Sequence, residues 1–165
     1  MPPRKYILDQ ATTEKKLRRM AYEIVENNLG ESEIIIAGIR DSGDVIARTI
    51  RQLLSEIHSI KTTLISVSLD KKMPRDIVLS DSVDFNGKVI LLVDDVANSG
   101  KTLLYSLKPF LEFHPKKIQI LVLVERTHKA FSIKPDYVGL SVATTFEDHI
   151  FVEVEADQVK GAWME

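Results

Sequence analysis

The sequence predicts an α/β fold in which helices flank a doubly wound, mainly parallel sheet. Three near-continuous apolar runs, at residues 34–37, 89–93 and 117–124, are typical of strands that are buried on both faces of such a sheet. Segments with helical spacing lie between these runs, which favours right-handed crossovers between parallel strands. The 165 residues, 44% of them hydrophobic, are enough for one domain, residues 1–165, with a sizeable core.

The first half of the chain is interpreted as two strand–helix pairs. After the first strand, apolar residues repeat at helical spacing, and we expect Thr12 or Thr13 to cap that helix and Gly30 to follow its end. The second pair joins a buried strand to a helix through a small-residue loop that starts at Gly38. These elements are expected at residues 6–8 (strand), 17–25 (helix), 34–37 (strand) and 45–54 (helix).

The second half of the chain continues this pattern after one irregular segment. Residues 70–88 mix charges with proline and glycine and have no clean period, so we expect a surface arm there, with hairpin strands around 77–79. A helix is expected to open at Thr102 and to continue to Leu111. The strands of this half are expected at residues 62–69, 89–93, 117–124, 136–140 and 150–154.

The composition excludes several classes of protein. The formal net charge of −2 argues against a protein that coats nucleic acid broadly. There is no cysteine, which rules out disulfides, thiolate nucleophiles and cysteine metal sites. No apolar run approaches the length of a membrane span, and the opening MPPRKYILDQ lacks the apolar core of a signal peptide, so a cytoplasmic location is expected.

The stretch KVILLVDDVANSGKTL, residues 88–103, combines a strand, two acids, a small polar turn and the start of a helix. The first turn of a helix leaves backbone N–H groups without partners, and the helix dipole adds positive potential there. Gly100 lets the backbone approach a ligand closely, and the Ser99 and Thr102 hydroxyls add donors. The turn therefore predicts a phosphate site. Its spacing is neither that of the Walker loop nor that of the G-x-G-x-x-G dinucleotide turn.

Asp94 and Asp95 would repel a phosphate, so we expect them to face another part of the same ligand. Sugar hydroxyls suit them, and so does Mg²⁺, which takes oxygen ligands and keeps several waters. A phosphate at the turn and a diol at the acids together describe a ribose 5-phosphate. The residues alone leave a second interpretation open, an ordinary strand–helix turn with Asp95 near the helix cap and no ligand.

The same residues carry a resemblance to a known family. An apolar run, two acids and a small-S-G-x-T loop resemble the phosphoribosyl-diphosphate (PRPP) signature of the type I phosphoribosyltransferases. The segments ILD…LRRMAYEIVENN and IQILVLVERTHKAFSIKPDYVGLSVATT are similar to those of the bacterial pyrimidine operon attenuator/uracil phosphoribosyltransferase family. The resemblance covers most of the chain and implies the type I phosphoribosyltransferase fold, with a small hood and a flexible arm at about residues 70–88.

The resemblance also implies an activity. In that family, ribose 5-phosphate passes from PRPP to a pyrimidine base such as uracil, diphosphate is released, and Mg²⁺ takes part. The chain would then be a pentosyltransferase of pyrimidine salvage that forms a homodimer or a higher homo-oligomer. Some members of the family also bind messenger RNA and control pyrimidine genes.

Individual residues receive roles from the resemblance. Asp94 and Asp95 would hold the ribose diol, directly or through water on Mg²⁺, and with Arg40 and Lys72 they are the catalytic candidates. The implied PRPP contacts are Asp94, Asp95, Ala97, Asn98, Ser99, Gly100, Lys101, Thr102, Arg40 and Gly43. The arm residues implied to close over the diphosphate are Lys71, Lys72 and Arg75, and the implied base contacts are Lys134, Val138, Gly139 and Leu140. Arg126 could reach the leaving group or the base, or make a structural salt bridge, and His128 is expected near the site rim.

Two departures from the family pattern bear on the activity. Arg40-Asp41-Ser42-Gly43 places an acid where the family's diphosphate loop reads T-R-G and has a basic residue. The arm reads Leu69-Asp70-Lys71-Lys72, without the tyrosine and the arginine of the family's Y-R-D-D run. For these reasons, efficient transfer to uracil and RNA binding both stay open.

Two alternative functions also stay open. One is a regulator that binds PRPP or a nucleotide with little turnover and binds RNA through first-helix cations; these are Lys15, Lys16, Arg18 and Arg19. The other is a hypoxanthine-guanine type enzyme, which Lys134-Pro135-Asp136-Tyr137-Val138-Gly139 also resembles, with the lysine on the purine oxygen. Those enzymes have an aspartate where this chain has Asn98, a residue that cannot act as an acid or a base.

Overall fold

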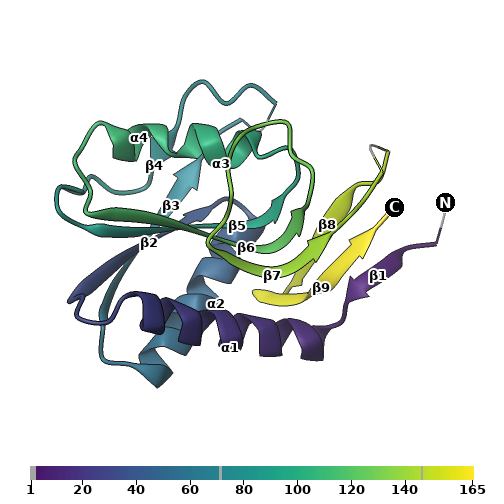
Figure 1. Ribbon diagram of the computed structural model, residues 1–165, viewed down its shortest axis with the longest axis horizontal. Coiled ribbons are helices and arrows are strands. Elements are labelled where there is room, and N and C mark those ends of the chain that lie inside the picture. Colours follow the sequence, from purple (N-terminus) through teal and green to yellow (C-terminus); the bar gives the residue numbers. More distant parts are fainter. Residues whose placement is uncertain (1–2, 71, 146) are drawn as a thin grey trace.

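The computed structural model describes residues 3–70, 72–145 and 147–165, which form two sheets with helices on both faces of the larger one (Figure 1). The larger sheet has the strand order β4-β3-β2-β5-β6-β7, and the smaller sheet has the order β1-β9-β8. The strands are β1 (Lys5–Leu8), β2 (Glu33–Ile39), β3 (Lys61–Ser68), β4 (Val78–Leu79), β5 (Val89–Ala97), β6 (Lys117–Arg126), β7 (Tyr137–Val142), β8 (Ile150–Glu155) and β9 (Gln158–Met164). The helices are α1 (Gln10–Asn27), α2 (Ser42–Ile57), α3 (Lys101–Ser106) and α4 (Lys108–Leu111).

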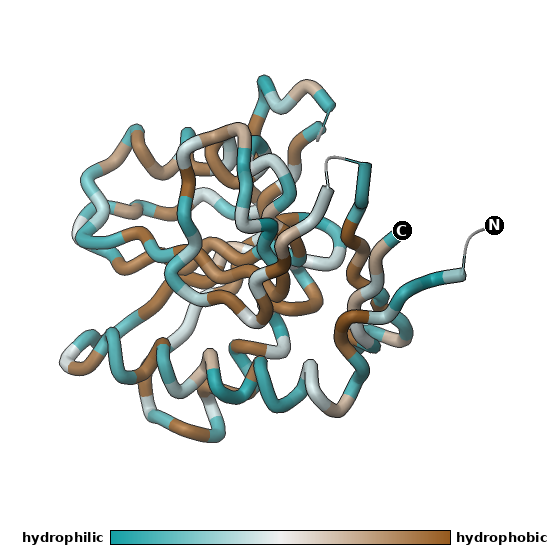
Figure 2. Tube along the Cα trace, turned by 45° about the vertical axis from the view of Figure 1, so that its right-hand side comes forward, coloured by the Kyte–Doolittle hydropathy of each residue, from teal (hydrophilic) through white to brown (hydrophobic). Residues whose placement is uncertain are grey.

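The predicted α/β fold with a mainly parallel sheet is confirmed. Strands β3, β2, β5, β6 and β7 run parallel, and β4 joins one edge antiparallel to β3. Leu91 of β5 packs with residues of α1 and α2, whereas its neighbour Leu92 packs with residues of α3 and α4. Burial on both faces explains why these strands are continuous apolar runs in the sequence. Figure 2 shows the hydrophobic residues along the central strands and the hydrophilic ones on the outer loops.

Helix α1 begins earlier than the sequence predicted. Its N-cap is Asp9, whose Oδ1 accepts the Thr12 backbone N–H at 2.7 Å, so the expected cap at Thr12 or Thr13 is wrong. The Thr13 hydroxyl instead donates to the Asp9 carbonyl oxygen at 2.7 Å. A carboxylate at this position is a strong cap because it pairs an otherwise orphaned N–H. Gly30, with φ 85°, follows the end of the helix as expected.

The helix expected from Thr102 to Leu111 is two short helices, α3 and α4, with a break at Leu107. Pro109 accounts for the break, because proline lacks the N–H that a continuous helix would need and disfavours a helical residue before it. Strand β5 in turn is longer than expected. It continues to Ala97, so the two acids lie inside the carboxyl end of the strand rather than after it.

The smaller sheet forms a hood beside the carboxyl ends of the parallel strands (Figure 1). Strand β9 was not predicted. It forms a hairpin with β8 through a two-residue turn in which Ala156 and Asp157 have φ of 48° and 63°. Two-residue hairpin turns of this kind usually have the sequence Asn-Gly or Asp-Gly, and the sequence Ala-Asp does not indicate one. The inner face of the hood, including Val152, Val159 and Ala162, packs into the same core as α1 and α2.

In the described part of the arm, residues 70 and 72–88, there is one short strand, β4, instead of a hairpin of its own. Val78 and Leu79 pair antiparallel with Ser68 and Val67 of β3, so the hairpin forms between the arm and the main sheet. Across the residues that the structure describes, none of the helices combines the length and apolar character that a membrane crossing requires.

Candidate active site

The turn that links β5 to α3, residues 97–101, is where the sequence predicts a phosphate site, and we call it the phosphate turn. Gly100 has φ 84°, and a Cβ at this position would lie 2.7 Å from Cγ2 of Ile133. Only glycine combines this backbone conformation with so close a neighbour. The Lys101 N–H donates to Oγ of Ser99 at 3.2 Å, and the Leu104 N–H donates to the Gly100 carbonyl at 3.0 Å. The turn is therefore tightly wound.

The connection from β6 to β7 passes over the phosphate turn and holds it. The Phe131 N–H donates to the Ser99 carbonyl at 3.0 Å, and Cδ of Lys129 lies 3.6 Å from the Cβ position of Gly100. The Lys129 ammonium is 3.2 Å from the Glu125 carboxylate, and these side chains are only 11% and 14% exposed. The sequence alone assigned no role to residues 129–133 of this connection, because no local pattern shows that they pass over the phosphate turn.

Asp94 and Asp95 both lie on the wall of a cavity of about 390 Å³. Asp94 is 1% exposed and Asp95 is half-buried. Each carboxylate accepts the backbone N–H of the following residue, at 2.9 Å from Asp95 to Asp94 and at 2.8 Å from Val96 to Asp95. The remaining cavity walls are formed by Ser42, Val96, Ala97, Asn98, Ser99, Gly100, Thr102, Leu103, Ile150, Phe151 and Val152. The predicted acids and the predicted phosphate turn thus share one cavity.

The segment that joins the end of β2 to the start of α2, residues 38–43, reaches the same cavity through its second half. Ser42 lines the cavity, and a Cβ on Gly43 would lie 2.9 Å from the Val93 carbonyl and 3.3 Å from Oδ1 of Asp94. Gly43 therefore lets the start of α2 pack directly on the acidic end of β5. The Arg40-Asp41 peptide bond is cis, and the Arg40 N–H donates to the Val67 carbonyl at 3.0 Å. The Arg40 side chain is exposed and does not line the cavity.

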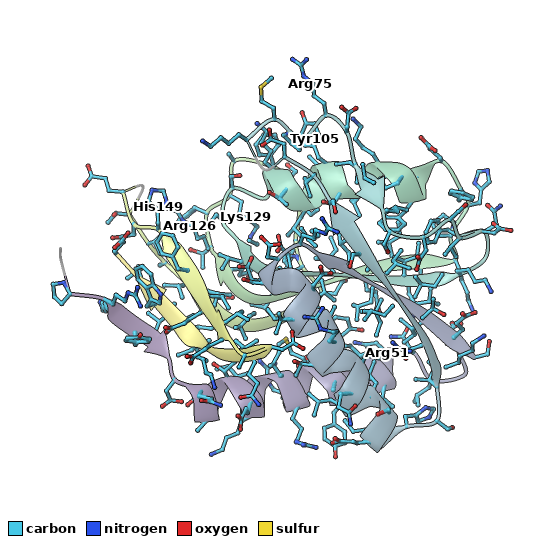
Figure 3. The ribbon with its side chains drawn as sticks, turned by 180° about the vertical axis from the view of Figure 1, so that it is seen from behind. Arg51, Arg75, Tyr105, Arg126, Lys129 and His149 are labelled. Carbon is cyan, nitrogen blue, oxygen red and sulfur yellow. The ribbon has the colours of Figure 1, made fainter. Side chains whose placement is uncertain are left out.

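Residues 72–75 of the arm lie beside α3, and none of them lines the cavity. The Lys101 ammonium is 3.5 Å from the Lys72 carbonyl oxygen, and the Lys108 ammonium is 3.4 Å from the Arg75 carbonyl oxygen. A separate hollow of about 150 Å³ lies here, and Figure 3 labels Arg75 and Tyr105 on this side of the molecule. The structure thus does not bring Lys72 and Arg75 to the acids, and Lys71 lies outside the described residues.

The residues expected at the base do not line the cavity. The Val138 carbonyl accepts from Arg19 at 3.0 Å, and the Gly139 carbonyl accepts from Lys16 at 3.0 Å, so the edge of β7 is covered by α1. Lys134 is exposed and lies just before Asp136, whose backbone N–H donates to Ile120 near the amino end of β6. Leu140 packs against the core that α1, α2 and the hood share. Val138 and Leu140 pair with Val122 and Val124 of β6, which pair in turn with Asp94 and Val96, so these β7 residues lie level with the acids but two strands away from them.

Instead, residues 150–152 of the hood strand β8 form the wall opposite the phosphate turn. Sequence reasoning missed them because the hood joins residues from both ends of the chain, β1 with β8 and β9. No local pattern in Ile150, Phe151 and Val152 distinguishes a strand that borders a ligand from an ordinary edge strand.

Arg126 lies at the end of β6 and has a structural role (Figure 3). Its Nε donates to Oγ1 of Thr144 at 2.8 Å, and its Nη2 donates to the Thr145 carbonyl at 2.6 Å. Asp148 accepts both the N–H and the hydroxyl of Thr145, and these hydrogen bonds, with a smaller effect of the Arg126 charge, lower the pKa of the Asp148 carboxyl. Arg126 thus fixes the connection that leads into β8. His128 is exposed in the loop that follows β6.

The acidic pair is the part of the site suited to a metal ion. Within the described ranges, no group of three or more His, Cys, Asp or Glu side chains is placed to hold a metal by itself. Mg²⁺ commonly binds through one or two carboxylates and completes its shell with water and ligand oxygens. Asp94 and Asp95 fit that mode of binding, in which the ligand brings part of the coordination.

A backbone turn at the start of a helix, two carboxylates beside it, and a position at the carboxyl ends of parallel strands define an α/β protein that binds a phosphorylated ligand. Residues 3–158 match the model of the phosphoribosyl transferase domain. The chain belongs to this family.

Two groups of known proteins are similar to the chain. The "Bifunctional protein PyrR" of Streptococcus pneumoniae strain CGSP14 is 33% identical over 157 residues, which cover 91% of this chain and 90% of that protein. Among solved structures, a hypoxanthine-guanine phosphoribosyltransferase of Bacillus anthracis has a TM-score of 0.72 at 20% identity, covering 91% of this chain and 87% of that one. The hypoxanthine phosphoribosyltransferase of Trypanosoma cruzi has a TM-score of 0.75 at 13% identity, with 86% and 83% covered. At these identities the structural likeness concerns the fold.

Proposed function

We propose that this protein transfers ribose 5-phosphate from PRPP to a nucleobase, with uracil as the favoured base, and releases diphosphate. The observation that carries the proposal is the shared cavity, in which the phosphate turn, the acids of β5 and the start of α2 meet within about 390 Å³. A ribose that carries a phosphate at one end and a diphosphate at the other needs these three kinds of partner. Family membership and the likeness to PyrR proteins support the same activity.

In this proposal the 5-phosphate binds at the phosphate turn. The backbone N–H groups of residues 97–101 and the hydroxyls of Ser99 and Thr102 are its donors, and the turn faces the cavity. The positive φ of Gly100 keeps the backbone itself, rather than a side chain, in contact with the ligand. Among the described residues that line the cavity there is no lysine or arginine, so the donors to the phosphate are backbone N–H groups and hydroxyls.

The ribose diol is assigned to the acids, and Asp95 has the more exposed carboxylate of the pair. Asp94 is almost fully buried, so it acts mainly by orienting the backbone of Asp95 through the 2.9 Å hydrogen bond. Mg²⁺ would be held by these carboxylates together with ligand oxygens, and it would neutralise charge on the departing diphosphate. Ser42 and the backbone at Gly43 lie nearest to the diphosphate, and Arg40 would approach it only by a change in the loop.

The base is assigned to the free edge of β8 instead of β7. His149 and Glu165 exchange two backbone hydrogen bonds, of 2.8 and 3.2 Å, and such pairs alternate along antiparallel strands. The N–H and C=O groups of Ile150 and Val152 therefore point away from β9, toward the side that lines the cavity. Uracil presents alternating carbonyl and N–H groups at its edge, which pair with such a strand.

Bond breaking at C1 of PRPP gives a centre with oxocarbenium character, which the base nitrogen attacks from the opposite face. The protein contributes by holding the two reactants at the right distance and by placing carboxylates near the developing positive charge. Asn98, a residue of the phosphate turn, borders the cavity, but its amide cannot act as a general acid or base. The proton of the base is therefore released to the diphosphate or to water.

The proposal is tested by calorimetric titration of PRPP in the presence of Mg²⁺. We expect Asp95→Asn to weaken PRPP binding at least about tenfold, because a charge-assisted contact to the diol is lost. Glu112→Gln, an equal change of charge at the exposed C-cap residue of α4, should bind like the wild type. Equal PRPP affinity in Asp95→Asn and Glu112→Gln would contradict the diol assignment, and a turnover screen with uracil, hypoxanthine and guanine identifies the base.

The RNA-binding alternative finds little support in the first helix. Lys16 and Arg19 donate to carbonyl oxygens of β7, and Arg18 lies 3.6 Å from the carboxylate of Glu56. Cations that are engaged within the protein have less charge to offer to RNA phosphates. A homo-oligomeric state and a cytoplasmic location remain part of the proposal, and light scattering tests the first of them.

A further inference from the structure

The outer face of the hood carries a layered arrangement of side chains that reaches the cavity. Tyr6, Trp163 and Phe151 lie in one row across β1, β9 and β8. The rings of Trp163 and Phe151 are stacked, with centroids 4.4 Å apart and planes 20° apart. The Arg4 guanidinium carbon lies 4.6 Å from the centroid of the Trp163 ring. We call Arg4, Trp163 and Phe151 the hood stack.

The carboxylate of Glu153 connects the hood stack to β1. Glu153 of β8 accepts from the Tyr6 hydroxyl at 3.0 Å and lies 3.7 Å from Nη1 of Arg4. Arg4 and Tyr6 belong to the first strand and its approach, so they join β1 to β8 across the intervening β9. The outer face of the hood therefore holds β8 through Phe151 and again through Glu153.

Phe151 connects this arrangement to the site. It lines the cavity together with Ile150 and Val152, the two residues assigned to the base. Ile150 and Val152 are packed from the inside by the core shared with α1 and α2, whereas Phe151 is 39% exposed and has the stack as its support. Among the described strands β8 is an edge strand that pairs with β9 alone, so its position depends on contacts at both faces.

We propose that Trp163 and Arg4 are positioning residues for the base, which act through Phe151 and set the edge of β8 against the cavity. The inference deepens the proposed function and rests on it. Neither residue lines the cavity, so neither touches the substrate. Loss of the indole ring leaves Phe151 without its stacking partner and Arg4 without the surface that it covers. The edge of β8 then occupies a broader range of positions. The backbone groups of Ile150 and Val152 are less often placed to form hydrogen bonds with the base.

The expected consequence is selective for the base. Trp163→Leu should raise the KM for uracil about threefold to tenfold, the range of an aromatic pair, and leave the KM for PRPP within about twofold. Trp163→Phe keeps a stacking ring and should restore the KM for uracil to within about twofold of the wild type. Arg4→Gln keeps the indole and should show a smaller effect of the same kind, about twofold.

Tyr22→Leu is the matched control, because Tyr22 is an exposed aromatic residue of α1 that lies outside the hood. Each variant is first checked by thermal unfolding, and kinetics are measured at a temperature where all variants are folded. A binding measurement free of turnover uses uridine 5′-monophosphate. Trp163 is the only tryptophan of the chain, so quenching of its emission reports the binding of this nucleotide in the wild type. Trp163→Leu lacks this fluorescence signal, so its affinity for the nucleotide is measured by calorimetry.

The outcomes separate the two proposals. If the wild type binds PRPP and uridine 5′-monophosphate and Trp163→Leu matches Tyr22→Leu in the KM for uracil, the hood stack has no positioning role. The same conclusion follows if Trp163→Leu raises the KM for PRPP and for uracil by equal factors, or if Trp163→Phe fails to restore it. If the wild type binds neither compound and turns over neither uracil nor a purine base, the proposed function itself is wrong.

Discussion

The backbone N–H of Phe131 donates to the carbonyl oxygen of Ser99 at 3.0 Å, which attaches the β6–β7 connection to the phosphate turn. Ile133 of the same connection approaches Gly100 so closely that an added Cβ would lie 2.7 Å from its Cγ2 atom. The shape of the phosphate turn is thus fixed from outside as well as by its own glycine.

Gly100→Ala is expected to weaken PRPP binding. Alanine is strained at φ 84° and would press on Ile133, and strain of about 1–3 kcal/mol corresponds to a loss of about fivefold to a hundredfold in affinity. Gly30→Ala is a matched control, because Gly30 has φ 85° with nothing within 4 Å of its Cβ position. Calorimetry with PRPP and Mg²⁺ should find the control close to the wild type. Equal losses in both variants would mean that the turn does not bind the ligand.

The Glu125–Lys129 pair beside the turn is expected to stabilise the fold more than a surface pair does. Lys129→Met would leave Glu125, which is mostly buried, with Ser141 as its remaining side-chain partner, at a cost of about 2–3 kcal/mol. A double-mutant cycle with Glu125→Gln, followed by urea unfolding, should give a coupling of about 1–3 kcal/mol. The Glu31–Lys116 pair, whose lysine is 58% exposed, serves as the control and should give at most about 0.5 kcal/mol. A coupling for Glu125–Lys129 no larger than the control value would refute the stabilising role.

Arg126 is expected to act on the connection into β8 rather than on the reacting atoms. Arg126→Ala removes the hydrogen bonds to Thr144 and Thr145, so the backbone N–H of Thr145 should exchange with solvent about tenfold faster. PRPP affinity should stay within about twofold of the wild type, which calorimetry checks. Arg51→Ala, which removes a single 3.3 Å hydrogen bond to Thr62, is the control. A large loss of PRPP affinity with unchanged exchange at Thr145 would favour a direct catalytic role instead.

The part of the site that the sequence predicts well is the part built from neighbours in the chain. Asp94, Asp95 and Gly100 lie within one strand–turn–helix unit, so their spacing alone places them on one cavity. The sequence also places Gly43, after the adjacent strand β2, close to the end of β5 for the same reason. Parallel strands bring such turns to one edge of the sheet without any further information.

The wall opposite the turn could not be predicted in this way. Residues 150–152 reach the cavity because the hood pairs β8 with β9 and β1, and pairing between the two ends of a chain leaves no periodic signal. Val138 and Gly139 were placed at the base by resemblance, but their carbonyl groups are taken up by Lys16 and Arg19. The sequence does not show that side chains of α1 reach these carbonyl groups, because that contact arises only when α1 packs against β7 in the folded protein.

The pair formed by Glu33 and Lys88 is expected to make the stability of the fold dependent on pH in the acid range. Lys88 Nζ donates to Oε2 of Glu33 at 3.0 Å, and this bond, with a second one from Thr63, lowers the pKa of the Glu33 carboxyl below its ordinary value of 4.5. A lowered pKa in the folded state means that the folded protein binds the proton more weakly than the unfolded chain does. The contribution is therefore complete above the ordinary pKa and is lost as the pH falls through the lower pKa of the folded state.

Glu33→Gln should accordingly be less stable than the wild type at pH 7 by about 0.5–1 kcal/mol, a modest value because Lys88 is partly solvated. The difference in the free energy of unfolding should shrink as the pH is lowered below 4.5, because the wild-type carboxyl becomes protonated there and resembles the amide. Urea unfolding at a series of pH values measures this difference, with Glu112→Gln as an exposed control that should follow the wild type throughout. A difference that is independent of pH would show that Glu33 contributes through packing, and that the bonds of its charged carboxylate to Lys88 and Thr63 add nothing to stability.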